Sequence, residues 1–369
     1  MAAVSNSVVH LTMRFGRTNL AIGTGMVYER EGKFYVVTAW HNLTGRHPDN
    51  LRFQSEQNAV PNNVVVNLAV SYGGFGASRM SVVLPLMDEE KALFLIHPSG
   101  WPRVDVVAIP FDPTGNLKME LHRFGEEVEE VLIALLDSSI SNIPADLCPI
   151  QRYLVPDPAI RESWLKNVEV TEELFIPGYP HNLQDYYSQP VWKRATIASS
   201  VQSGWDGQAK YLVDSASKSG MSGSPVLYYS PKGAVQVGGI SYRFQTDVAI
   251  LAGIYVGREG VTEKADPQVG IVWHQSVIDE IIDGGIFEKL PFEIEINPSA
   301  LDVAVNEELK TCSRIGLNNI LNPKMPSRYL VRESVLKNIQ GRAMPEQALE
   351  AVIRLAAIYD GPLVPDEED

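Results

Sequence analysis

The sequence is organised around one run of small residues, Gly220-Met221-Ser222-Gly223-Ser224-Pro225. It lies between two apolar stretches, 211–213 and 226–229, that have the composition of strands, so it must form a tight bend. Small residues let backbone approach backbone there, and the amides of Gly220 and Ser222 can point at one place where an oxyanion would develop. Such a run is also typical of an ordinary loop, so a nucleophilic role for Ser222 requires a base and an orienting carboxylate elsewhere.

A histidine follows the β-branched and aromatic stretch Phe34–Ala39. At the end of a buried strand, where a loop begins, His41 is partly enclosed and partly open, which suits a general base. The alternative is a histidine that serves only the hydrogen bonding of the loop. The glycines of the preceding strand, Ala21–Val27, predict a bend or a close backbone approach.

One acid stands within the apolar run Arg103–Pro110. A carboxylate in such a run is costly unless a partner balances its charge or donates a hydrogen bond to it. An imidazole would do both for Asp105. Arg103, two residues away on the same face of the expected strand, is the alternative partner through a local ion pair.

The three candidates occur in the order His41, Asp105 and Ser222, each at the edge of an expected strand. His41 follows Val-Thr-Ala, Asp105 precedes Val-Val-Ala-Ile, and Ser222 lies in Gly-x-Ser-Gly-Ser-Pro. This combination resembles the chymotrypsin-like (trypsin fold) serine peptidases, and the resemblance covers about residues 5–285. It implies an all-β fold with two antiparallel six-stranded β-barrels.

The domain organisation follows from this resemblance and from the apolar periodicity of the remaining chain. Helix-like spacing at 126–136 predicts a helix in the connection between the barrels, and the amphipathic pattern at 345–359 predicts a helical end of the chain. We expect four parts: an N-terminal barrel at 1–111, a connection with a helix at 112–168, a second barrel with a closing helix at 169–285, and a mainly helical extension at 286–369.

The resemblance also implies a role for each site residue. The chain would be a serine endopeptidase in which Ser222 attacks the carbonyl, His41 takes its proton and Asp105 orients the imidazole. The amides of Gly220 and Ser222 would form the oxyanion hole.

Two departures from the family are informative. Animal digestive members carry an acid just before the nucleophile, which receives a newly cut N-terminal ammonium; Met221 stands there, so regulation must come from a partner or a conformational change. Ala216 stands where trypsin has the acid that binds basic side chains, which implies a neutral residue before the cleaved bond. Val256 and Gly257 fall where substrate pairs with the enzyme by β-augmentation.

Composition limits the function classes. The 369 residues are 45% hydrophobic and carry a formal net charge of −14, which argues against a general nucleic-acid binder and an anionic-membrane binder. Cys148 and Cys312 are far apart, and the start of the chain lacks a signal peptide, so we expect a cytoplasmic protein without disulfides, metals or cofactors.

The expected partners are a protein or peptide substrate and a regulatory protein that binds the C-terminal extension. The alternative function is a catalytically silent binding or scaffold protein on a peptidase fold. A quality-control protease with a β-rich peptide-binding module is disfavoured by the helical pattern after 287.

Overall fold

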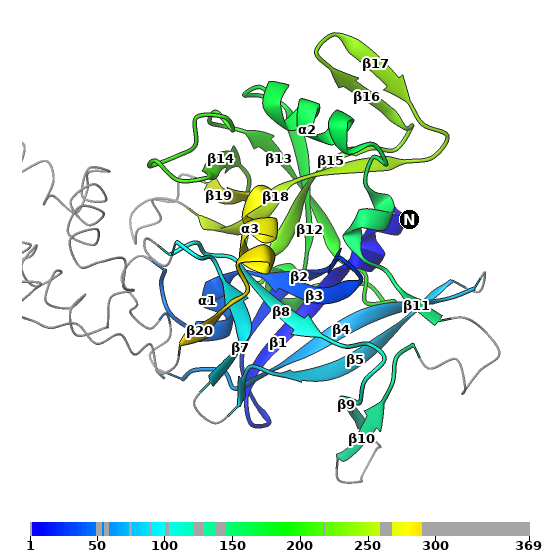
Figure 1. Cartoon of the computed structure of the whole chain (residues 1–369), viewed down its shortest axis with the longest axis vertical. Helices are drawn as coiled ribbons and strands as arrows, with labels where there is room; N and C mark the ends of the chain where they lie inside the picture. Colours follow the sequence, from blue (N-terminus) through cyan, green and yellow to red (C-terminus); the bar gives the residue numbers. More distant parts are fainter. Residues whose placement is uncertain are drawn as a thin grey trace, which may run out of the picture.

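A computed structural model describes residues 2–48, 54, 59–73, 76–88, 91–99, 103–121, 128–136, 145–216, 218–258 and 268–289. Within these ranges β-strands dominate and the α-helices are short. The strands form two units that Figure 1 shows one above the other, an N-terminal sheet drawn in blue and cyan and a C-terminal barrel drawn in green and yellow. No helix of the described part is long and apolar enough to cross a membrane.

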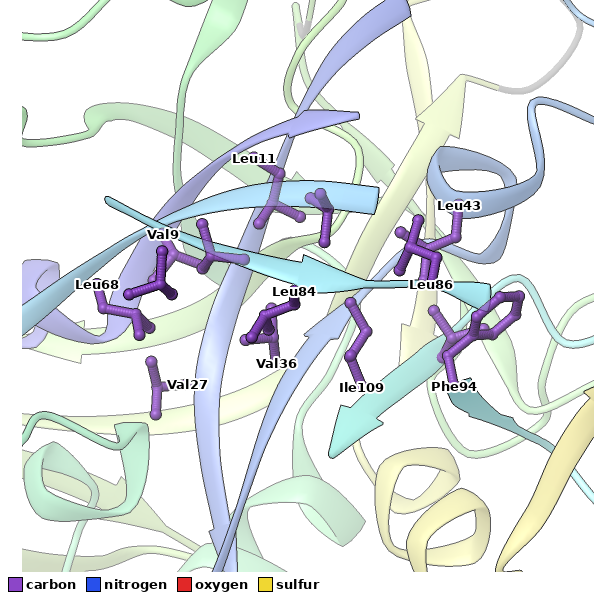
Figure 2. Close-up of a cluster of buried hydrophobic side chains, with 14 of the residues drawn as sticks. Val9, Leu11, Val27, Val36, Leu43, Leu68, Leu84, Leu86, Phe94 and Ile109 are labelled. Carbon is purple, nitrogen blue, oxygen red and sulfur yellow. The ribbon is translucent and has the colours of Figure 1, made fainter. Parts of the chain in front are cut away.

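The N-terminal sheet is antiparallel and has 12 strands, with the main order β10-β9-β5-β4-β1-β2-β3-β8-β7-β20. Alternating apolar residues of its strands point inward and form one core cluster, which Figure 2 shows between the strands. Its elements before the second unit are β1 (Val8–Phe15), β2 (Thr18–Arg30), β3 (Lys33–Thr38), α1 (Trp40–Thr44), β4 (Asn63–Tyr72), β5 (Ala77–Pro85), β6 (Met87–Asp88), β7 (Lys91–Ile96), β8 (Val107–Phe111), β9 (Leu117–Leu121), β10 (Glu129–Ile133) and β11 (Ala145–Leu147).

The predicted closure of this sheet into a barrel is only partly confirmed. Strand β5 pairs with β9 on its outer side, so the β9–β10 hairpin takes the edge that closure would need. In the described residues the sheet curves back on itself only through a short contact after β5, where β6 pairs with β7 and Leu93 N donates to Leu86 O at 2.9 Å. The N-terminal unit is therefore a half-barrel.

The second unit confirms the prediction of a closed six-stranded barrel, in the order β12-β13-β14-β19-β18-β15. Helix α2 begins with Pro158 after the N-cap Asp157, whose side chain accepts from Ala159 N at 2.9 Å. The elements of this half are α2 (Pro158–Asn167), β12 (Glu173–Gly178), β13 (Val191–Ile197), β14 (Lys210–Asp214), β15 (Ser224–Ser230), β16 (Ala234–Val237), β17 (Ile240–Arg243), β18 (Val248–Arg258), β19 (Val269–His274), α3 (Ser276–Gly284) and β20 (Ile286–Lys289).

Two local predictions were wrong. The helix expected at 126–136 is strand β10 at its centre, because residues 129–133 pair with β9. His41 lies in the short helix α1 rather than in a loop.

The chain after the barrel returns to the N-terminal sheet. Helix α3 ends at Gly285 in the left-handed conformation, and β20 then pairs antiparallel with β7, with Ile286 opposite Ile96. The extension expected to be helical from 286 thus begins with a strand, and its remainder, 290–369, lies outside the described residues. Cys148 is a buried free thiol, and Cys312 also lies outside the described residues.

Candidate active site

His41 and Asp105 are paired through two hydrogen bonds. Asp105 Oδ1 accepts from the backbone N–H of His41 at 2.9 Å, and Oδ2 lies 2.8 Å from Nδ1 of its ring. Both side chains are largely enclosed, with 12% of His41 and 7% of Asp105 exposed. Because a carboxylate only accepts hydrogen bonds, Nδ1 carries the proton and Nε2 is the basic nitrogen.

The choice between partners for Asp105 is therefore decided in favour of the imidazole. Arg103 pairs instead with Glu288, whose Oε2 lies 2.6 Å from Arg103 Nη1. Asp105 precedes β8 rather than lying inside it, and it reaches α1 because β3, which leads into α1, pairs with β8.

The serine turn, residues 218–225, is shaped by two consecutive reverse turns. Met221 N donates to Lys218 O at 3.2 Å, and Ser224 N donates to Met221 O at 3.0 Å. Gly220 and Gly223 have φ of 93° and 90°, which disfavours any residue with a Cβ. A Cβ on Gly223 would also collide with the carbonyl oxygen of Thr24, so the turn needs glycine there for two reasons.

The amides expected to form the oxyanion hole are available in this turn. Among the described residues, neither Gly220 N nor Ser222 N donates a hydrogen bond. The carbonyl of Ser219 accepts from His181 N at 2.8 Å, and the carbonyl of Met221 accepts from Ser224 N. The N–H and C=O groups of a trans peptide point in opposite directions. The N–H of Gly220 therefore points away from His181, and the N–H of Ser222 points away from the amide of Ser224.

The Ser222 hydroxyl donates to the carbonyl oxygen of Val256 at 3.0 Å. No hydrogen bond joins it to His41 in the described part of the chain. Strand β18 has a register shift between Tyr255 and Gly257, and a bulge of this kind re-aims the backbone groups beside it. In the structure, His41 and Asp105 are therefore paired with each other, and the candidate nucleophile Ser222 is hydrogen-bonded to β18 instead of to His41.

Two polar side chains join the serine turn to the N-terminal sheet. Asn42 Nδ2, next in the chain to His41, donates to Ser222 O at 2.9 Å and to Thr38 Oγ1 at 3.0 Å. Thr24 N donates to the same Ser222 carbonyl at 3.0 Å, and its hydroxyl donates to Gly220 O at 2.7 Å. Neither residue was predicted from the sequence to belong to the site.

The glycines of β2 are the signal that could have found this contact. A Cβ on Gly23 would lie 2.6 Å from Asn42 Nδ2, and one on Gly25 would lie 2.9 Å from Val37 O. The close backbone approach predicted for Ala21–Val27 is thus confirmed, and it brings β2 against α1 and the serine turn.

Met221 anchors the serine turn in the core of the second barrel. Its side chain is fully buried in the core of the second barrel, and its Sδ would lie 3.0 Å from a Cβ on Gly178. A buried apolar side chain therefore occupies the position that was singled out in the sequence because an acid is absent from it.

The residues predicted to bind substrate lie on two sides of the turn. The ladder between β15 and β18 ends at the pair Ser224–Tyr255, so the backbone of Val256 and Gly257 continues beyond it. A Cβ on Gly257 would meet open space, which agrees with a strand that a peptide can approach. Ala216 is exposed just after β14, and its place in a specificity pocket stays a prediction.

No protein-family model and no curated protein matches this chain. Solved structures similar to it include the inactive form of the Rv3671c protease from M. tuberculosis, with 16% identity, coverage of 77% of this chain and 90% of that chain, and a TM-score of 0.35. The active form has 14% identity, coverage of 80% and 86%, and a TM-score of 0.35. A serine endoprotease from Yersinia pestis has 12% identity, coverage of 77% and 65%, and a TM-score of 0.35. The two M. tuberculosis structures are named as a protease and the Yersinia pestis structure as a serine endoprotease. At TM-scores of 0.35 this likeness carries no functional argument, so a function for this chain has to be argued from the geometry of its own site.

Proposed function

We propose that the protein is a serine endopeptidase, with His41, Asp105 and Ser222 as its catalytic residues. The observation that carries the proposal is the pairing of both Asp105 oxygens with His41, one residue before the Asn42 side chain that holds the carbonyl of Ser222. A buried carboxylate that fixes the imidazole next to a tight serine turn supports a role in acyl transfer.

The reaction would proceed through an acyl-enzyme. Ser222 Oγ attacks the carbonyl carbon of the substrate while His41 Nε2 takes its proton, and the amides of Gly220 and Ser222 bind the oxyanion. Each oxyanion donor is worth about 3 kcal/mol of the barrier. The C–N bond then breaks as His41 returns the proton to the leaving amine, and water repeats the sequence of steps on the ester, releasing the acid and the free serine.

Substrate would bind as an extended chain along Val256 and Gly257, with a neutral side chain near Ala216. A substrate N–H that donates to Val256 O would replace the hydroxyl of Ser222 there, so binding would free the nucleophile to rotate toward His41. Interactions at the reacting centre commonly tighten only in the complex with substrate. Activation of this kind is a conformational change, which fits a turn anchored by buried Met221 rather than by an inserted N-terminus.

Regulation by a protein partner through residues 286–369 remains part of this proposal. The strand β20 supports it, because it connects that region directly to the sheet that carries His41 and Asp105. A partner that binds after Lys289 and displaces β20 would change this sheet first.

A fluorophosphonate probe tests the proposal, because it phosphonylates an activated serine with loss of fluoride. We expect the wild-type full-length chain to be labelled and Ser222→Ala and His41→Ala to remain unlabelled. Ser219→Ala is the matched control, since it removes an exposed hydroxyl from the same turn and should label like the wild type. Equal labelling of wild type and Ser222→Ala, or no labelling of wild type in the presence of peptide, would overturn it.

A catalytically silent binding protein is the second candidate, and the bond from Ser222 to Val256 O is the observation that favours it. Such a protein would bind extended peptides to β18 without acylation. Peptide binding by calorimetry combined with absent labelling of wild type would select this function.

A further inference from the structure

The last described strand buries its acid and exposes its apolar residues. In β20, Ile286 and Phe287 are 41% and 48% exposed, whereas Glu288 is 4% exposed. This reverses the usual preference, because glutamate is almost never fully buried without a partner. The reversal points to a specific task for the Glu288 carboxylate.

That carboxylate binds two side chains of the N-terminal unit. Its Oε2 accepts from Trp40 Nε1 at 2.8 Å and from Arg103 Nη1 at 2.6 Å. The guanidinium carbon of Arg103 also lies 5.2 Å from the ring centre of Trp40, within the range of a cation–π contact. The ion pair is dry, with 3% of the Arg103 side chain and 2% of the Glu288 side chain exposed.

Each of these two side chains adjoins one member of the His41–Asp105 pair. Trp40 directly precedes His41 in α1, and Arg103 lies two residues before Asp105. The single carboxylate of Glu288 therefore holds the chain just before His41 and just before Asp105.

The ion pair also determines which partner Asp105 can have. Arg103 is a buried cation, and a buried cation needs a counter-charge. With Glu288 in place, that charge comes from β20. Without it, the nearest carboxylate along the chain is Asp105, which Arg103 would draw away from His41.

We infer that Glu288 is a positioning residue of this site, which holds Trp40 and Arg103 so that Asp105 stays bonded to His41. The inference rests on the proposed function only for its effect on catalysis. It makes the last described strand a structural part of the proposed site, although Glu288 lies 183 residues after Asp105.

The first experiment needs no activity. In full-length Ser222→Ala protein, the proton of His41 Nδ1 should give one low-field ¹H NMR signal, because it is bonded to a buried carboxylate. Adding Glu288→Gln keeps the shape and an oxygen for Trp40 but removes the charge, and we expect this signal to shift or disappear. Adding Arg103→Met as well removes the uncompensated cation and should restore the signal.

The second experiment measures the kinetics of peptide hydrolysis in protein that retains Ser222. With a peptide substrate, Glu288→Gln should lower kcat by about 10- to 100-fold, because small displacements of a catalytic group cost up to about 100-fold, while KM changes little. The double variant Arg103→Met with Glu288→Gln should recover most of kcat. Glu120→Gln is the matched control, since it neutralises another buried ion pair of this unit, Arg14–Glu120, between β1 and β9.

The two experiments separate the possible failures. An unchanged low-field signal in Glu288→Gln, or a double variant as impaired as the single one, overturns the positioning role. A general cost of losing a buried ion pair would impair Glu120→Gln and Glu288→Gln alike, and that result would also overturn the positioning role. Absence of labelling in the wild type overturns the proposed function and leaves the NMR result to decide the role of Glu288.

Discussion

The two β units carry different halves of the site and secure them in different ways. The C-terminal barrel is closed, and its serine turn is fixed by its own glycines and by Met221 in its own core. The N-terminal sheet is a half-barrel, and β20 from the other end of the described chain adds a strand to it and a counter-charge to Arg103. The half with the proposed nucleophile Ser222 is thus shaped within its own barrel and held by Asn42 and Thr24 of the other unit. The half with the proposed base also receives a counter-charge from a strand that is distant in the sequence.

The largest expected effect concerns the base half. Asp105→Asn keeps the size of the side chain but offers an N–H where His41 needs an acceptor, which favours the wrong tautomer of the imidazole. By analogy with the serine-protease triad, kcat should fall by about 10⁴-fold. Rates of peptide hydrolysis measure this, with Asp112→Asn, an exposed acid after β8, as control. A fall of less than tenfold would mean that Asp105 does not orient the base.

The next effect tests the nucleophile half. Met221→Asp places a carboxylate in the buried core of the barrel, without a cation to pair with it. We expect the free energy of unfolding to fall by about 3–5 kcal/mol, the scale of an uncompensated buried charge. Denaturant titration measures the change, and Met221→Leu should cost less than about 1.5 kcal/mol because it keeps the volume apolar. Equal stability of the two variants would contradict the anchoring role of Met221.

A smaller effect is expected where the two units meet. Asn42→Ala removes the hydrogen bonds to Ser222 O and Thr38 Oγ1. The loss should cost about 1–3 kcal/mol if the acceptors stay buried, and it should slow fluorophosphonate labelling because the turn is less well placed. Asn63→Ala, which removes an amide that bonds the exposed turn at Gly16, is the control for labelling. Labelling at the wild-type rate would show that Asn42 serves stability alone.

The smallest effect is a pH dependence of stability at the same interface. His10 of β1 packs edge-on against Tyr179, with ring centres 5.1 Å apart, and burial lowers the pKa of His10 below its ordinary 6.5 although a bond to Asn182 opposes the shift. The unfolded chain therefore binds a proton at His10 more readily than the folded chain does. The full free energy of unfolding is present above about pH 6.5, and part of it is lost as the pH falls below this value. His10→Phe should flatten the thermal-melting profile between pH 7 and pH 5. An equally steep profile in this variant would assign the effect to other groups, such as His274, whose pKa burial also lowers.

Secondary structure was predictable where one pattern dominated and failed where two patterns fitted. The stretch Phe34–Ala39 is β-branched and aromatic, and the strand expected from it is β3. Residues 129–133 fit both the helical period of 3.6 residues and the strand period of two, because two acids followed by three apolar residues can belong to a helix or to an edge strand. Pairing with β9 decided the matter, and no local signal reports such a pairing.

His41, Asp105 and Ser222 could be proposed as site residues without a structure, because they stand in short motifs whose order and flanking residues are local properties. The glycines that allow β2 to approach α1 and the serine turn are likewise visible in the sequence. The three-dimensional fold was needed to show that Asp105 bonds His41 rather than Arg103, that Ser222 donates to Val256 O, and that Glu288 supplies the counter-charge. These choices depend on contacts between residues up to 185 positions apart, and the energy of a buried charge is set by what surrounds it in space rather than by its neighbours in the chain.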